Sequence, residues 1–161
     1  MTKATTQVSI RDMSLRSVNA LIRRNYVGRI AYSFHDIVEI RPLLYVVDGK
    51  WLFGRTSPGD KLLTLRHNQW VAFEVDEING PFDWSSAVLH GSFYHLSPDG
   101  SVFDKRLYDR AVKLVRGFSP SVLTDEDPVA FRTEFFGISI DRATGRMCRE
   151  MSPKPRKGRA R

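Results

Sequence analysis

The stretch GRTSPGDK, residues 54–61, has the two glycines of a phosphate-binding loop, separated by four residues, but departs from such a loop at its end. A nucleoside triphosphatase places Lys and then Ser or Thr after the second glycine, so that an ammonium and a magnesium-ligating hydroxyl meet the phosphates. Here Asp60 and Lys61 take those positions and Leu62 follows. The stretch therefore predicts either a loop for a phosphate that needs no magnesium, or a capped surface helix with incidental basic residues.

The residues around this stretch predict a strand that leads into the N-terminus of a helix. KWLFGRT, residues 50–56, reads as a strand, and residues 57–60 place Ser, Pro and Asp at the N-cap, first and third helical positions. Free amides and the positive end of a helix dipole favour an anion there. The side chains that add charge or hydroxyl donors are Arg55, Thr56, Ser57 and Lys61.

Short segments rich in β-branched and aromatic residues make up most of the remaining chain. They are VGRIAYSF (27–34), VEIRPLLYVVD (38–48), WVAFEVDEI (70–78), SAVLHGSFYHLS (86–97) and EFFGISID (134–141). Asp48 and Gly49 form a tight-hairpin signal, and apolar spacing predicts helices over 14–24 and roughly 101–116. This pattern favours a mainly β fold, an antiparallel barrel with peripheral helices, over a parallel doubly wound sheet.

Composition indicates one domain. The 161 residues, 42% of them hydrophobic, are enough for a single core, and we expect an N-terminal extension (1–13), a domain (14–150) and a disordered basic tail (151–161). The tail carries five of the seven net positive charges, which leaves +2 for residues 1–150. Nucleic acid is therefore not an expected partner, although a weak tether to nucleic acid or to an acidic protein is the alternative for the tail.

No run approaches the roughly 20 apolar residues of a membrane helix, and the first ten residues lack a signal-peptide pattern. We expect a cytoplasmic protein without membrane association.

Several segments, in this order, carry a resemblance to a known family. A first helix leads into VGRIAYS, and RPLLY, FGRTSPGDKL, VAFEVDE and WSSAVLHGSF follow, with ISIDRATGRM near the C-terminus. This order resembles the pyridoxamine 5′-phosphate oxidase-like family of flavin-binding split barrels, most closely its small FMN-binding members. The resemblance implies a six-stranded antiparallel split barrel. It also implies a homodimer with one FMN in each of two clefts at the subunit interface.

The resemblance further implies which residues bind the cofactor. A flavin 5′-phosphate needs donors and positive charge but no magnesium, and the flat ring needs an apolar slot. The matching residues are Arg55, Thr56 and Lys61 at the phosphate with Ser57 beside them, Pro42, Leu43 and Leu44 along the isoalloxazine with Arg41 beside them, and Trp84 and Ser86 in a W-x-S segment that closes the cleft.

The function implied is an FMN-dependent oxidoreductase that passes electrons between a reduced nicotinamide and a small-molecule acceptor. Because a flavin carries the chemistry itself, no catalytic side chain is assigned. Two alternatives remain open, a flavin carrier or sensor without turnover and a reductase that uses the deazaflavin F420. Nitroimidazole-resistance relatives usually have His at the position of Gly54 and often Asn at that of Leu44, so their chemistry is not expected here. Vitamin B6 oxidation is not predicted either, because the segment after Phe131 is too short.

Other candidate residues have simpler interpretations. His90 and His95 lie five residues apart on a strand and so on opposite faces, and no metal site is expected. Gly91 predicts a bulge or a close backbone approach to the flavin or to a partner subunit. Asp76 and Glu77, at a strand end, are interpreted as solvated.

Overall fold

A computed structural model describes residues 7–151, which form an antiparallel sheet with three helices around it. The strands are β1 (Gln7–Asp12), β2 (Val27–Phe34), β3 (Ile37–Leu44), β4 (Val46–Asp48), β5 (Trp51–Thr56), β6 (Trp70–Gly80), β7 (Asp83–Leu96) and β8 (Glu134–Met151), and the helices are α1 (Leu15–Arg24), α2 (Asp60–His67) and α3 (Val102–Phe118). The predicted fold class, mainly β with peripheral helices, is confirmed. The strand count differs, since the sheet has eight strands where six were expected.

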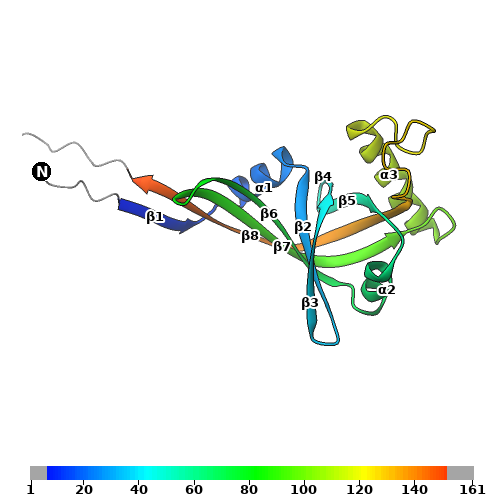
Figure 1. Cartoon of the computed structure of the whole chain (residues 1–161), viewed down its shortest axis with the longest axis horizontal. Coiled ribbons are helices and arrows are strands. Elements are labelled where there is room, and N and C mark those ends of the chain that lie inside the picture. Colours follow the sequence, from blue (N-terminus) through cyan, green and yellow to red (C-terminus); the bar gives the residue numbers. More distant parts are fainter. Residues whose placement is uncertain (1–6, 152–161) are drawn as a thin grey trace, which may run out of the picture.

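The sheet has the order β3-β2-β6-β7-β8-β5-β4, and β1 pairs with β8 outside this path. Strand β8 changes its second partner along its length, because Glu134–Ser139 pairs with β5 and Arg146–Met151 pairs with β1. The two halves of β8 therefore belong to different parts of the molecule. One end, with β1 and the β6–β7 hairpin, forms an extended arm, and the other joins the curved sheet that carries α2 and α3 (Figure 1).

The observed element boundaries agree with the predicted ones where neighbouring residues determine them. Strand β2 has the predicted bounds, and α3 begins at a capping box between Ser101 and Asp104. The strand predicted over 38–48 is instead broken at Tyr45. The buried Tyr45 hydroxyl donates a 2.7 Å hydrogen bond to the carbonyl of Ile22, one of the carbonyls that the end of α1 leaves without an intrahelical donor.

The first and last strands of the described chain extend further than the sequence pattern predicts. Residues 7–12 form β1 and pair with β8, so they belong to the sheet rather than to a separate extension. Strand β8 continues ten residues past the predicted end at Asp141, because both β7 and β1 supply backbone partners there. Most of the basic tail predicted over 151–161 lies outside the described residues. Within the described part of the chain, no helix is long and apolar enough to cross a membrane.

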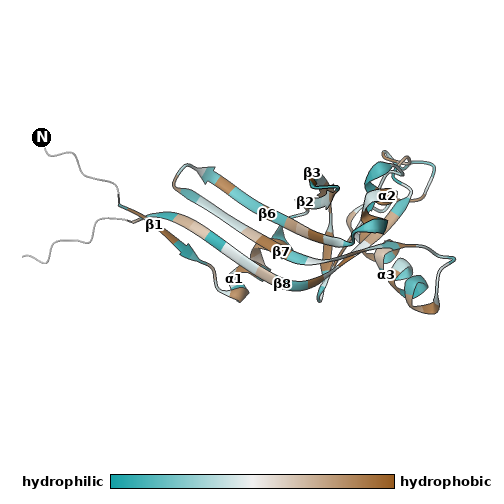
Figure 2. Ribbon diagram, turned by 90° about the horizontal axis from the view of Figure 1, so that it is seen from below, coloured by the Kyte–Doolittle hydropathy of each residue, from teal (hydrophilic) through white to brown (hydrophobic). Residues whose placement is uncertain are grey.

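Two apolar cores lie on opposite faces of β5. Successive side chains of a strand alternate between faces, so Leu52 joins the barrel core with Phe73 and Phe136, while Phe53 packs under α3 with Leu107. Helix α1 adds a buried stripe to the barrel core. The hydropathy colouring in Figure 2 shows apolar stretches along the long strands β6, β7 and β8.

Glu77 fixes the end of α1 to the sheet. Arg24 donates two 2.7 Å hydrogen bonds to its carboxylate, and Asn25 donates a third of 2.7 Å. These donors, Arg24 first, lower the pKa of Glu77 to about 2. Asp76 in turn accepts from Arg29 at 2.8 Å. Both acids, interpreted from the sequence as solvated, are partly exposed and are also held in ion pairs on the sheet.

Gly91 sits at an irregularity of the sheet, as its position inside a strand predicts. The register between β7 and β8 shifts between His90 and Gly91, and a Cβ at Gly91 would lie 1.8 Å from the carbonyl oxygen of Ser139. The bulge is confirmed. The close approach that excludes a side chain is to β8 of the same chain.

Candidate functional site

A groove of about 600 Å³ lies between the β2–β3 hairpin and the junction of β5 with α2. This volume is within the usual range for small-molecule and cofactor sites, about 300–1,000 Å³. Six of the ten predicted cofactor residues line it, namely Arg41, Pro42, Leu43, Thr56, Ser57 and Lys61. Segments 41–43 and 56–61 come together because the hairpin faces the end of β5 across the opening of the barrel.

Lys61 is the half-buried cation at one end of the groove. Its ammonium donates a hydrogen bond to the hydroxyl of Thr56. Burial lowers the pKa of Lys61, and the charges of Arg132 and Arg41 lower it further. Lys61 has no carboxylate partner among residues 7–151, whereas Arg41 pairs with Glu39 at 2.8 Å on the surface. Lys61, Arg41 and Arg132 thus converge at this end of the groove, and among residues 7–151 only Arg41 is paired with a carboxylate.

The start of α2 lies two residues later than predicted. Helix α2 begins at Asp60 with Gly59 as N-cap, and no side chain caps it. Gly59 has φ 149°, a conformation that glycine adopts far more readily than other residues, so the chain turns at Gly59 and not at Ser57. Ser57 and Pro58 remain outside the helix and line the groove. The first amides of α2 still lack intrahelical acceptors, as expected for an anion site.

The other half of the groove is largely apolar. Tyr32, Phe34, Ile37 and Leu43 project from the hairpin, with Pro42 beside them. Tyr32 and Leu43 are almost completely buried, whereas Phe34 and Ile37 are exposed at the rim. The groove therefore has one cationic end and one apolar wall, an arrangement that suits a flat apolar group attached to an anion.

Arg55 does not take part in this cationic end, which corrects its expected role at the phosphate. It lies on the opposite face of β5 from Thr56 and donates hydrogen bonds of 2.5 and 2.7 Å to the two carboxylate oxygens of Asp127. Both side chains are buried. Arg55, with the amides of Leu123 and Val129, holds the pKa of Asp127 well below its usual range. The positive charge of Arg55 is therefore neutralised inside the protein.

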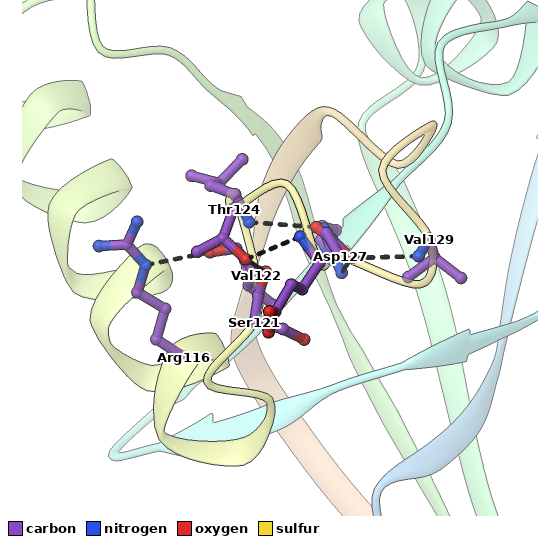
Figure 3. Close-up of polar contacts among 9 residues, drawn as sticks. Arg116, Ser121, Val122, Thr124, Asp127 and Val129 are labelled. Atoms are coloured by element: carbon purple, nitrogen blue, oxygen red, sulfur yellow. Dashed lines mark hydrogen bonds and ion pairs between the residues drawn. The ribbon is translucent and has the colours of Figure 1, made fainter.

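Arg132 supplies the third cation, and sequence reasoning missed it. It lies in residues 119–133, between α3 and β8, where neither helical nor strand periodicity is present. Asp127 accepts a hydrogen bond from the amide of Val129, and the carbonyl of Val129 accepts one from the amide of Arg132. Figure 3 shows Asp127 at the centre of this loop, with Val129 beside it. The sequence shows an acidic stretch before Arg132, residues 125–127, but it does not reveal that Asp127 pairs with Arg55 and leaves Arg132 free to face the groove.

Leu44 lies outside the groove, at a crossing between β3 and β5. It lines a second cavity instead. A Cβ at Gly54 would lie 2.5 Å from the Leu44 carbonyl oxygen and 2.6 Å from the ring of Phe136. Position 54 therefore has no room for a side chain unless β3 or Phe136 moves.

Trp84 and Ser86 lie on the arm and do not line the groove. The Ser86 hydroxyl donates a 3.0 Å hydrogen bond to Glu74, and the Trp84 carbonyl accepts one of 2.7 Å from Arg149. Within one copy of the chain, these two residues do not close the site. The two histidines of β7 contact different groups, since His95 pairs with Glu134 at 2.6 Å and His90 lies 3.4 Å from Arg142.

Comparison with known proteins identifies the family to which the chain belongs. Residues 14–147 match the family model described as pyridoxamine 5′-phosphate oxidase. The chain belongs to this family. The resemblance identified from the sequence is thereby confirmed, and it covers nearly all of the described residues.

Three members or neighbours of the pyridoxamine 5′-phosphate oxidase family illustrate the likeness. An uncharacterized protein of Rhizobium meliloti is 25% identical over 142 residues, covering 85% of this chain and 94% of the relative. The crystal structure of a FAD-binding protein from Mesorhizobium loti is 25% identical with a TM-score of 0.69, covering 88% and 98% of the two chains. The FAD-binding protein of Mycobacterium smegmatis, 21% identical with a TM-score of 0.59 and coverage of 92% and 100%, shares the fold.

Proposed function

We propose that this chain binds a flavin nucleotide in the groove, with the phosphate at Lys61 and the ring along β3. The observation that carries the proposal is the convergence of Lys61, Arg41 and Arg132 at one end of a groove whose other wall is apolar. A phosphate would supply the negative charge that the half-buried lysine lacks among the described residues. The FAD-binding relative from Mesorhizobium loti supports this assignment.

FMN is the smallest flavin that meets these requirements. Its phosphate ends the molecule, so the Lys61 ammonium, the Arg41 guanidinium, the Thr56 hydroxyl and the first amides of α2 would account for all the contacts of the phosphate. FAD carries a further phosphate and an adenosine, which would extend past the start of α2. The names of the related structures make FAD the second candidate, and F420 remains a third.

We propose that the working form is a homodimer, with the cofactor between the subunits. The outer face of the β2–β3 hairpin and the adjoining end of β6 expose Val38, Ile40 and Trp70, each at least 60% accessible. Exposed apolar residues gathered in this way are typical of interaction surfaces. In such a dimer Trp84 and Ser86 could reach the groove only from the partner's arm, which is the role proposed for them.

The proposed activity is oxidoreduction between a reduced nicotinamide and a small-molecule acceptor in the cytoplasm. A bound flavin would supply the hydride and electron chemistry. The residues of the chain would bind and orient the cofactor: Lys61 and Arg41 hold its anionic end, and Tyr32 and Leu43 exclude water from the ring. A flavin carrier or sensor would use the same contacts without turnover. Flavin-dependent consumption of NADPH in the presence of a small acceptor separates these two functions.

The binding proposal is tested by titrating FMN into the full chain and into Lys61→Met, with FMN fluorescence as the readout. Loss of one charge-assisted contact is worth about 1.5–3 kcal/mol, or about ten- to a hundredfold in affinity. Lys105→Met, an exposed lysine on α3, is the matched control and should bind like the parent. Equal affinity of Lys61→Met and the parent would show that the groove is not the phosphate site.

A further inference from the structure

A second cavity, of about 230 Å³, adjoins the groove on the other face of β5. It lies between the ends of β3 and β5 on one side and α3 with residues 119–129 on the other. Its walls are mainly apolar and include Leu44, Phe53, Val115, Phe118, Val122 and Val129. Arg132 lines both this cavity and the groove, so its guanidinium stands at their common boundary.

The charges around the cavity leave one cation available. Arg55 lines it, but both of its donors are used by Asp127. The Asp127 carboxylate also accepts from the amides of Leu123 and Val129, so its oxygens already have four donors and it is not available to a second arginine. The Arg132 guanidinium has no ion pair and no hydrogen-bond partner among residues 7–151, and it lies 6.0 Å from the Phe131 ring.

The walls are held apart by contacts that do not depend on a ligand. The Arg55–Asp127 pair ties the loop to β5, and the Arg116 side chain donates a 3.2 Å hydrogen bond to the Val122 carbonyl, which ties it to α3 (Figure 3). A preformed cavity of this kind spares a ligand the cost of ordering the loop. At about 30 Å³ for each displaced water, it has room for a molecule with one ring.

We propose that this cavity binds a small aromatic carboxylic acid, with its ring against Phe53 and Phe118 and its carboxylate on Arg132. An acid is favoured over an amine because the one carboxylate in contact with the wall, Asp127, is saturated. An aromatic ring is favoured by the two phenylalanines, since offset and edge-on ring contacts add to apolar burial. The inference deepens the proposed function, and rests on it, in making this acid the second ligand beside the flavin.

The test is calorimetric titration of the full chain with benzoate, phenylacetate and 3-phenylpropanoate, and with benzyl alcohol as the neutral analogue. At least one acid should bind saturably, about tenfold or more tightly than benzyl alcohol. Val129→Phe, which fills the cavity, should lower the affinity for the acid by about tenfold or more and leave the affinity for FMN within about twofold of the parent. Val102→Phe, on an exposed part of α3, is the matched control. Val46→Phe fills the cavity from the opposite wall and replaces Val129→Phe if that variant does not fold.

Each outcome separates this inference from the flavin proposal. Acid binding that responds to Val129→Phe supports the cavity site even if FMN does not bind, in which case the proposed function alone fails. Competition between the acids and FMN would overturn the inference, because the cavity would then hold the flavin ring. The inference is also overturned if none of the acids binds, or if acid binding is unaffected by both filling variants.

Discussion

Arg55 and Asp127 are joined by two hydrogen bonds, 2.5 and 2.7 Å long, on the face of β5 that points away from the groove. The pair links a barrel strand to the loop that presents Arg132. The family resemblance assigns Arg55 to the phosphate. In the structure Arg55 instead binds Asp127, and through it holds the loop that carries Arg132.

Replacing Arg55 by Met should loosen residues 119–133 at neutral pH and make the stability of the loop depend less on acid. In the parent the pKa of Asp127 is lowered, so its stabilising contribution is present above the ordinary Asp pKa of about 3.9 and is lost as the pH falls through the folded value. Without Arg55 the buried carboxylate loses its main stabilising partner and its pKa rises. Loop protection measured by hydrogen exchange should therefore be lower than in the parent at neutral pH, and it should fall less as the pH drops from about 4 to about 2, because less of the Asp127 contribution remains to be lost.

The control for this variant is Arg146→Met, which removes an exposed 3.5 Å pair with Asp12 on the arm. It should leave exchange in the loop unchanged, because exposed pairs contribute little. Identical exchange profiles for Arg55→Met and the parent would mean that the pair does not hold the loop.

FMN affinity should fall at alkaline pH, starting below the ordinary lysine pKa of about 10.4. Burial and the charges of Arg132 and Arg41 lower the pKa of Lys61 in the free protein, and a phosphate binds the protonated lysine. Affinity is therefore constant between the second pKa of the phosphate, about 6, and the Lys61 pKa of the free protein, and it decreases as the pH rises through the latter, with proton uptake on binding. Titrations at several pH values should show this slope in the parent and a flatter profile in Lys61→Met. Parallel profiles would place the titrating group elsewhere.

Gly91→Ala should destabilise the fold, because the new Cβ would meet the Ser139 carbonyl oxygen at 1.8 Å. Overpacking of this kind typically costs about 1–3 kcal/mol, measurable as a lower urea midpoint. Gly80→Ala, where a Cβ would meet nothing within 4 Å, is the control and should stay within about 0.5 kcal/mol of the parent. Equal midpoints for the two variants would show that β7 and β8 are not this close at the bulge.

If the homodimer uses the outer face of the β2–β3 hairpin, Ile40→Glu should be monomeric. Ile40 is 60% exposed in one chain, and a charge buried in an apolar interface without a partner is costly. Analytical ultracentrifugation should find the parent and Val102→Glu as dimers, since Val102 lies on α3. A dimeric Ile40→Glu would place the interface on another surface.

The parts of the fold that could be predicted depend on neighbouring residues. Period-two alternation gives β2 its bounds, Ser101 and Asp104 mark the start of α3, and the hairpin at Asp48–Gly49 appears with Gly49 at φ 61°. The parts that could not be predicted depend on partners distant in sequence. Strand β1 exists because β8 extends to meet it, and no local pattern in residues 7–12 shows this.

The same division applies to the candidate site. Thr56 and Lys61, predicted at the phosphate, line one groove together with Arg41, because the barrel strands set their positions. Arg55 was misplaced because its direction depends on a partner 72 residues away. Arg132 was missed because its loop has no periodicity and is shaped by that same pair.

The measurement that tests the central claim most directly is the visible absorption spectrum of the purified full chain, with the released chromophore identified by mass spectrometry. The account predicts a bound flavin, about one for each chain, with FMN or FAD identified by its mass. A colourless protein that neither quenches FMN fluorescence nor takes up added FAD would contradict it. The cationic groove would then have to bind an anion of another class.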